Sequence, residues 1–197
     1  MRADREDTSP ERETQWIRDI AKGDRGAFES FYQTYQSRLF HYLYVMVRAV
    51  ELAEELTNDV MLEVWKGAGR FRGQSKPSTW LFGIAHHKAL NELRRRRPPL
   101  ESLQALHKTP DPALGPEALT VRDSVRAGIW RALSALSPEH REVVELTFYH
   151  QATYQEIAAI VSCPANTVKT RAFYAKRHLR KLLAEEGSQM DDRERSS

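Results

Sequence analysis

The sequence predicts an all-α protein made of two small helical domains joined by a flexible, proline-rich linker. Apolar residues recur at spacings of three and four along most of the 197-residue chain, which is the period of a helix. No segment alternates apolar and polar residues as a half-buried strand would. Five prolines fall within residues 98–119, a segment with little periodicity. We therefore expect one domain at residues 14–97, a second at 120–184, and a mobile linker between them.

The first domain is predicted to follow a charged, disordered start at residues 1–13. A short helix at 14–22 should stop at Gly23, and Asp24 can cap a long helix at 25–48 because its carboxylate can accept a free backbone N–H. Along this long helix the apolar positions recur at spacings of three and four residues, which is the helical period.

The helical pattern resumes at residues 51–66 and is then interrupted by three glycines. Pro77 suits the first turn of a fourth helix, because the N–H that proline lacks would be unpaired there anyway. That helix runs into four consecutive arginines, Arg94 to Arg97, before Pro98-Pro99 ends it.

The second domain is predicted to contain helices at 120–136, 138–150, 154–161 and 164–184, followed by a polar tail at 185–197. Ser137 is a suitable N-cap before Pro138. Thr153 and Glu156 fit a capping box, in which each side chain satisfies a backbone N–H of the other's residue.

The last two helices of the second domain are predicted to form a helix-turn-helix. Ile157, Ala158 and Val161 would face inward, and Ser162-Cys163 would form the turn before a second helix whose basic face lies in the DNA major groove. Residues 164–183 carry six Lys/Arg and no acid. The alternative is an amphipathic helical hairpin with a solvated basic face. The predicted DNA-facing residues are Asn166, Thr167, Lys169, Thr170, Arg171, Tyr174 and Arg177.

Charge is distributed unevenly along a chain whose formal net charge is only +3. Residues 70–97 carry eight Lys/Arg against one acid, so they form a second candidate anion-facing surface. No apolar run approaches the ~18 residues of a membrane span, and no signal-peptide core is present. We expect a soluble, cytoplasmic protein that is not inserted in a membrane.

The sequence offers little for catalysis or cofactor binding. The adjacent residues His86 and His87 point to different faces of a helix, so we expect no metal site there. The single cysteine, Cys163, excludes an intramolecular disulfide and has no resolving partner. No glycine-rich phosphate loop or nucleophile elbow occurs, so we expect no catalytic residue, no cofactor and no enzymatic activity.

The C-terminal half resembles a bacterial sigma factor of the extracytoplasmic-function (ECF) group. The resemblance is carried by residues 154–158 (YQEIA), 166–171 (NTVKTR) and 175–180 (AKRHLR), with 136–143 (LSPEHREV) resembling the start of that region. The resemblance implies that this domain reads the −35 promoter element.

The N-terminal half resembles the same family. Residues 53–60 (AEELTNDV) with 63–65 (EVW) are similar to the helix that docks on RNA polymerase, and 71–85 with the arginine block are similar to the −10 element reader. The implied polymerase-binding residues are Glu55, Asn58, Asp59, Leu62 and Trp65. The implied −10 DNA-binding residues are Arg70, Phe71, Arg72, Gln74, Ser75, Lys76, Trp80, His87, Asn91, Arg94 and Arg95.

The resemblance, over about residues 27–183, implies an alternative sigma factor. Its partners would be the clamp and flap surfaces of core RNA polymerase, promoter DNA and an anti-sigma factor. The rival hypotheses are a stand-alone helix-turn-helix regulator with a ligand pocket, and a helical enzyme acting on nucleic acid. The docking helix and the arginine-ended helix disfavour the first rival, and the lack of a nucleophile disfavours the second.

Four positions depart from residues common in the family. Asn58 stands where glutamine is frequent, His87 where asparagine is, Asn91 where aspartate is, and Ser162 where glycine is. Three of these lie in the first domain, so the departures leave the contacts at −10 less defined than those at −35. Trp65 and Trp80 can each be either core residues or contact residues.

Overall fold

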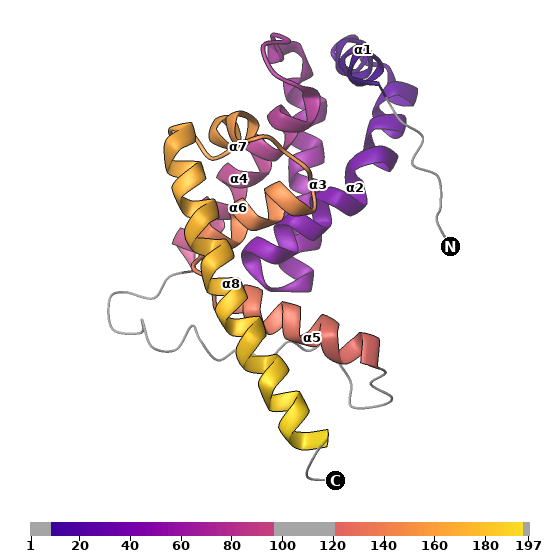
Figure 1. Cartoon of the computed structure of the whole chain (residues 1–197). Helices are drawn as coiled ribbons and strands as arrows, with labels where there is room; N and C mark the ends of the chain where they lie inside the picture. Colours follow the sequence, from indigo (N-terminus) through magenta and orange to yellow (C-terminus); the bar gives the residue numbers. More distant parts are fainter. Residues whose placement is uncertain (1–8, 97–120, 195–197) are drawn as a thin grey trace.

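The computed structural model describes residues 9–96 and 121–194, and these residues form helices and no strand. The helices before the gap are α1 (Pro10–Ile20), α2 (Arg25–Val47), α3 (Val50–Gly67), the 3-10 turn η1 (Ala68–Arg70) and α4 (Pro77–Arg95). Those after the gap are α5 (Val121–Ser134), α6 (Pro138–Phe148), α7 (Tyr154–Ile160) and α8 (Ala165–Glu194) (Figure 1). The predicted all-α class is confirmed. The predicted linker at 98–119 lies outside the described residues.

Several helix starts follow the capping signals in the sequence. The side chain of Asp24 accepts the N–H of Ala27, and that of Ser137 accepts the N–H of His140. Both hydrogen bonds of the capping box at Thr153 are present. These side chains satisfy backbone donors that have no partner within the helix, so they fix where α2, α6 and α7 begin.

Two helix boundaries differ from the prediction by more than two residues. The first helix begins at Pro10 rather than Thr14, because Ser9 caps it and proline fits its first turn, so residues 10–13 are helical and not disordered. The last helix continues to Glu194, so most of the predicted polar tail is helical. Glu185, Glu186 and Gln189 are good helix formers, and charge alone does not end a helix.

The first bundle is built around α2. Its side chains Phe31, Tyr35, Leu39, Tyr42 and Leu43 are completely buried. The helices α1, α3 and α4 all pack on α2, so it is enclosed on several sides. A helix that is buried on several sides needs apolar residues around most of its circumference, which explains the high apolar content of residues 25–47.

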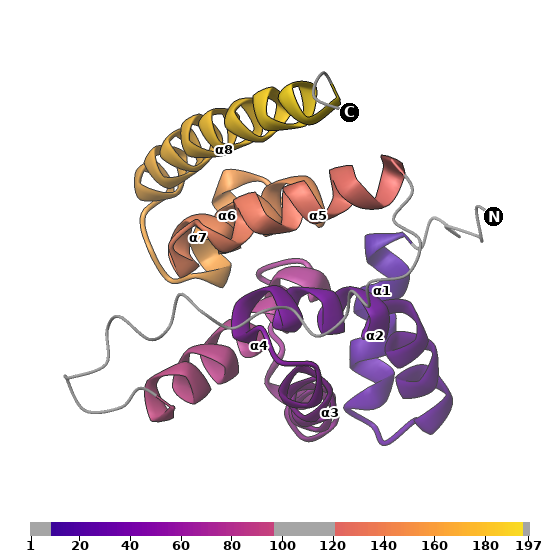
Figure 2. The ribbon, with the colours of Figure 1, turned by 90° about the horizontal axis from the view of Figure 1, so that it is seen from below.

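The second bundle packs directly against the first. The helix α6 lies against α2, and α7 lies against α4. Figure 2 shows the layers: α6 and α7 lie between α8 and the first bundle. One apolar core runs across the boundary and includes Leu81 and Phe82 of α4 together with Val143, Leu146 and Ile157 of the second bundle. Two helical units were expected, but the sequence did not predict this closed arrangement.

Candidate nucleic-acid and polymerase interfaces

The helix-turn-helix has the predicted internal packing. Ile157, Val161, Val168, Ala172 and Ala175 are buried, and Ala158 is partly buried against the same core. The turn residue Ser162 has a φ of 52°, a left-handed conformation that favours glycine. The carbonyl of Pro164 accepts the N–H of Val168, so Pro164 is the N-cap residue of α8, which begins at Ala165, one residue later than predicted.

The predicted −35 residues lie on the solvent side of α8. Asn166, Lys169, Thr170, Tyr174 and Arg177 are exposed, whereas Thr167 and Arg171 are half-buried. This face is therefore accessible even though the two bundles are packed together. Phe173, next to Tyr174, is also exposed, and it was not among the predicted residues.

The predicted −10 residues form a loop and one side of α4. The exposed members are Arg70, Arg72, Gln74, Ser75, Lys76, His87, Asn91, Arg94 and Arg95. Phe71 and Trp80 are half-buried and pack on each other, with ring centroids 5.3 Å apart. Each aromatic ring therefore keeps part of its surface free for stacking with an extruded base.

Most of the cations in this segment already have an acidic partner. Arg70 lies 2.6 Å from Glu63, and Lys88 lies 3.5 Å from Asp59. Glu92 pairs with both Arg95 and Arg96, at 2.9 and 2.6 Å, and these arginines lower the pKa of its carboxyl group. Exposed ion pairs of this kind are weak, so DNA phosphates can displace the carboxylates.

The predicted docking face of α3 is an open, mixed patch. Glu55, Asn58, Asp59 and Leu62 are exposed, and Leu62 keeps 48% of its surface accessible. Trp65 is half-buried, and its ring meets that of Phe28 edge-on at 5.3 Å. Trp65 is thus partly core and partly surface, and the rest of the set suits contact with a partner protein.

A second polar feature, which the sequence did not predict, lies between the two bundles. The carboxylate of Glu142 on α6 is buried and accepts a hydrogen bond from the hydroxyl of Tyr42 on α2. Nδ1 of His86 on α4 lies 2.6 Å from the same oxygen. Burial and the two nearby carboxylates raise the pKa of Tyr42, so its hydroxyl remains a donor. Glu142 therefore joins three helices of both bundles.

Glu145, one turn further along α6, makes similar contacts. Nδ1 of His41 lies 2.7 Å from its carboxylate, and Nε2 of His150 lies 3.3 Å from the same oxygen. Burial opposes the charge on Glu145, but the two imidazoles outweigh burial and lower the pKa of its carboxyl group. Among the described residues, no group of three or more His, Cys, Asp and Glu is arranged to hold a metal ion.

Arg141 supports the same interface. Its guanidinium donates to the carbonyls of Leu133, Ser134 and Leu136 in its own bundle and to that of Val45 in α2. Burial, with a smaller effect from Arg48, lowers the pKa of Arg141 to about 10. One signal in the sequence could have indicated these residues. Val143, Val144 and Leu146 lie on several sides of α6, so the charged residues between them are close to a packed surface.

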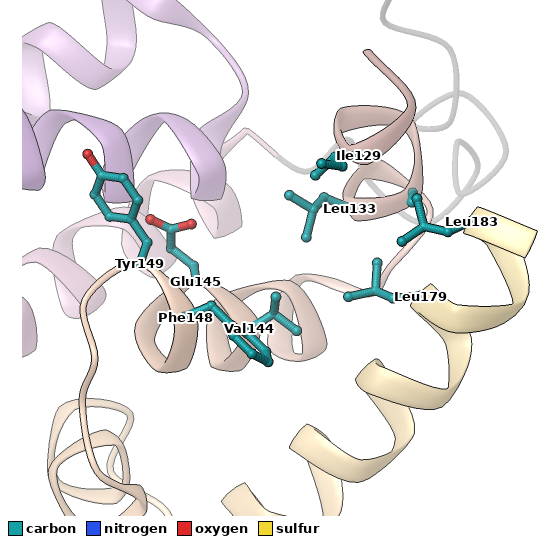
Figure 3. A pocket seen from close by; sticks show the side chains of 9 residues that line it. Ile129, Leu133, Val144, Glu145, Phe148, Tyr149, Leu179 and Leu183 are labelled. Carbon is teal, nitrogen blue, oxygen red and sulfur yellow. The ribbon is translucent and has the colours of Figure 1, made fainter. Parts of the chain in front are cut away.

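An apolar groove lies on the other side of the second bundle. It has a volume of 240 Å³ and lies between α5, α6 and α8 (Figure 3). Its lining includes Ile129, Leu133, Val144, Phe148, Leu179 and Leu183. Phe148 is 60% exposed, so the groove presents apolar surface to the solvent.

Comparison with known proteins identifies the family. The Sigma-70 region 2 model matches residues 31–98, and the Sigma-70 region 4 model matches residues 132–181. The chain is 28% identical to the RNA polymerase sigma-H factor of Pseudomonas aeruginosa over 183 residues, which cover 88% of this chain and 94% of that protein. It is 29% identical to the ECF RNA polymerase sigma factor SigK of Mycobacterium tuberculosis over 170 residues, which cover 85% of this chain and 91% of that protein. The chain belongs to the ECF group of the sigma-70 family.

The fold of this ECF sigma factor also matches solved structures. CnrH, in complex with the cytosolic domain of CnrY, is 19% identical with a TM-score of 0.66, covering 88% of this chain and 98% of that one. RpoE from Bartonella quintana, in complex with the anti-sigma factor NepR, is 24% identical with a TM-score of 0.65. The match covers 80% of this chain and 96% of that one. At these identities the likeness concerns the fold.

Membership of the family settles the general function. The sigma factor directs RNA polymerase to promoters through regions 2 and 4, and it is not an enzyme. The prediction of an alternative sigma factor is confirmed, and the rival hypotheses of a stand-alone regulator and a nucleic-acid enzyme are wrong.

Proposed function

We propose that the exposed face of α8 reads the −35 element of the promoter. The observation that carries this proposal is a single solvent-exposed stripe, from Asn166 to Arg177, that contains no acidic residue and begins directly after the turn. The first turns of a recognition helix enter the major groove, where amides, hydroxyls and guanidinium groups can bond to base edges. Lys169 and Arg177 also suit phosphate contacts.

The first bundle would dock on the polymerase clamp and open the DNA at the −10 element. The mixed patch around Leu62 on α3 supports the docking role, because an exposed leucine beside polar groups is a suitable centre for a protein interface. The rings of Phe71 and Trp80 are half-buried and lie beside the cations at 70–76, which supports the capture of bases from single-stranded DNA.

The apolar groove of the second bundle would receive the polymerase flap.

Run-off transcription with purified core polymerase tests these assignments. Promoter-specific transcripts from cognate genomic templates are expected only when the sigma factor is added. Substitution of the α8 face should abolish dependence on the −35 sequence, whereas substitution of the α3 face should abolish binding to core. Unchanged transcription by both sets of variants would contradict the assignments.

We also propose that an anti-sigma factor controls this protein in the cytoplasm, where polymerase acts. CnrH and RpoE were solved as complexes with CnrY and the anti-sigma factor NepR, respectively, and this chain shares their fold. In the described part of the chain no helix is long and apolar enough to cross a membrane. Co-purification from native cells should recover a further protein besides polymerase subunits, and recovery of polymerase alone would count against this partner.

A further inference from the structure

Two aromatic rings lie on the solvent side of α8, where the packing of the second bundle does not account for them. Phe173 is 63% exposed and Tyr174 is 51% exposed, whereas their helix neighbours Ala172 and Ala175 are buried. The two ring centroids are 5.5 Å apart and the rings meet edge to face at 77°. Two adjacent aromatic rings this accessible leave apolar surface in water, and covering that surface by a partner would be favourable.

Phe173 lies along the proposed DNA-reading stripe of α8. It follows Asn166 by seven residues and Thr170 by three, and it precedes Arg177 by four. Residues at these spacings share one face of a helix, and all four of these side chains are exposed. A helix that places this stripe in the major groove therefore brings the phenyl ring to the base edges together with the polar side chains around it.

The chemistry of the major groove restricts what a phenyl ring can bind there. Base edges in this groove present hydrogen-bond donors and acceptors and one apolar group, the 5-methyl group of thymine. A phenyl ring that covers a polar edge removes water from it and offers no hydrogen bond in return, which costs free energy. The ring therefore favours a thymine beneath it over the other three bases.

We propose that Phe173, with Tyr174 beside it, binds the 5-methyl group of a thymine in the −35 element and thereby selects that base. The inference rests on the proposed −35 role of α8. It adds an apolar contact to the amide, hydroxyl and guanidinium contacts of that face. The ring of Tyr174 lies against one side of Phe173, so it restricts the movement of the phenyl ring and supplies a second apolar wall.

The surroundings of the two rings favour DNA over a protein partner. Exposed aromatic residues are also common in protein interfaces. The apolar groove of the second bundle, however, takes Leu179 and Leu183 from α8, and neither Phe173 nor Tyr174 lines it. Residues 164–183, which include both rings, carry six Lys/Arg and no acid, so the apolar corner lies within a basic surface suited to a nucleic acid.

Removal of single thymine methyl groups tests the contact. Holoenzyme made from core polymerase and the full chain is titrated with a duplex that contains the −35 element of a promoter mapped by run-off transcription and ends before the −10 element. Each −35 thymine is replaced in turn by uracil, which lacks only the methyl group. At one position the affinity should fall about fourfold, which corresponds to about 0.8 kcal/mol, the value of one buried methylene.

Substitutions of the ring assign this loss to Phe173. Phe173→Ala should bind the thymine duplex about fourfold more weakly and should no longer distinguish thymine from uracil at that position. Phe173→Leu keeps an apolar side chain and should retain part of the distinction. Arg180→Ala, which removes an exposed arginine further along α8, is the control and should lower both affinities by the same factor.

Three results would overturn the proposal. The first is a −35 element in which no thymine loses affinity when uracil replaces it, and the second is an undiminished preference for thymine in Phe173→Ala. The third is a loss of core affinity by Phe173→Ala in the absence of DNA, which would place the ring in a protein interface. Failure of the −35 assignment itself is distinguishable, because the unmodified holoenzyme would then bind the mapped and a scrambled −35 duplex equally.

Discussion

His41 Nδ1 lies 2.7 Å from Glu145 Oε1, although the two residues are 104 positions apart in the sequence. The imidazole of His41 also stacks on the ring of Tyr149, with centroids 4.1 Å apart. Glu145 in turn approaches His150, whose ring packs on Phe82 of the first bundle at 4.3 Å. The boundary between the bundles is therefore a layer of titratable groups enclosed by aromatic rings, and its stability should depend on pH.

We predict that the stability of the protein falls as the pH is lowered below about 6.5. Burial, only partly offset by Glu145, lowers the pKa of His150 below its ordinary value, so the folded state favours the neutral imidazole. A lowered histidine pKa contributes stability above the unfolded value, and this contribution is lost as the pH falls toward the folded value. Glu145, whose pKa is also lowered, adds a second loss below its ordinary value of 4.5. Urea denaturation between pH 8 and pH 4 measures both steps.

His150→Phe provides the matched variant for this prediction. Nδ1 of His150 has no hydrogen-bond partner among the described residues, and its Nε2 makes a poorly aligned contact of 3.3 Å with the carboxylate of Glu145. The surrounding Tyr42, Phe82 and Tyr149 can accept a phenyl ring. The other charged groups near it, Arg38 and His41, remain in place. The variant should lose the first acid step and show a smaller second step, because His150 and His41 together lower the pKa of Glu145 and only His41 remains. An identical pH profile in the variant would show that His150 does not cause the first loss.

Arg171→Ala should weaken binding to −35 duplex DNA by about 1–3 kcal/mol if the guanidinium bonds to a guanine. Arg171 is half-buried beside the turn, with one guanidinium nitrogen 4.0 Å from the sulfur of Cys163, so its position is restricted. Fluorescence anisotropy with cognate and scrambled duplexes gives both affinities. Arg180→Ala, an exposed arginine further along α8, is the control and should reduce both affinities slightly and equally. An equal loss on the two duplexes for Arg171→Ala would make it a phosphate contact.

Leu62→Ala should weaken binding to core polymerase about tenfold without changing the melting temperature. Leu62 is 48% exposed, so its removal costs the free protein little, whereas covering a leucine in an interface contributes about 1.5–3 kcal/mol. Val50→Ala, an exposed apolar residue at the other end of α3, is the control. Equal core affinities for the two variants would place the docking surface elsewhere.

The sequence predicted the local structure well because local signals determined it. Asp24, Ser137 and Thr153 cap helices as expected, since a cap depends only on residues within one turn. The exposed stripe of α8 could be predicted in the same way, because the helical period places its residues on one face of the helix. The interface between the bundles could not be predicted in this way. Glu142 and Glu145 look like ordinary surface acids in the sequence, and only the packing of α6 on α2 buries them.

Ser162→Gly should stabilise the second bundle by about 0.5–1 kcal/mol. Ser162 adopts a φ of 52°, where a residue with a Cβ is strained by about 1–2 kcal/mol, and the larger entropy that glycine loses on folding offsets part of the gain. Ser162 is exposed, so removal of its side chain leaves no cavity. Thermal denaturation of the two variants Ser162→Gly and Ser162→Ala separates backbone strain from side-chain loss: only the glycine variant should melt at a higher temperature. DNA affinity should stay the same, because the backbone of the turn already has the conformation that glycine prefers. If the alanine variant melts as high as the glycine variant, strain at this turn is not what limits stability.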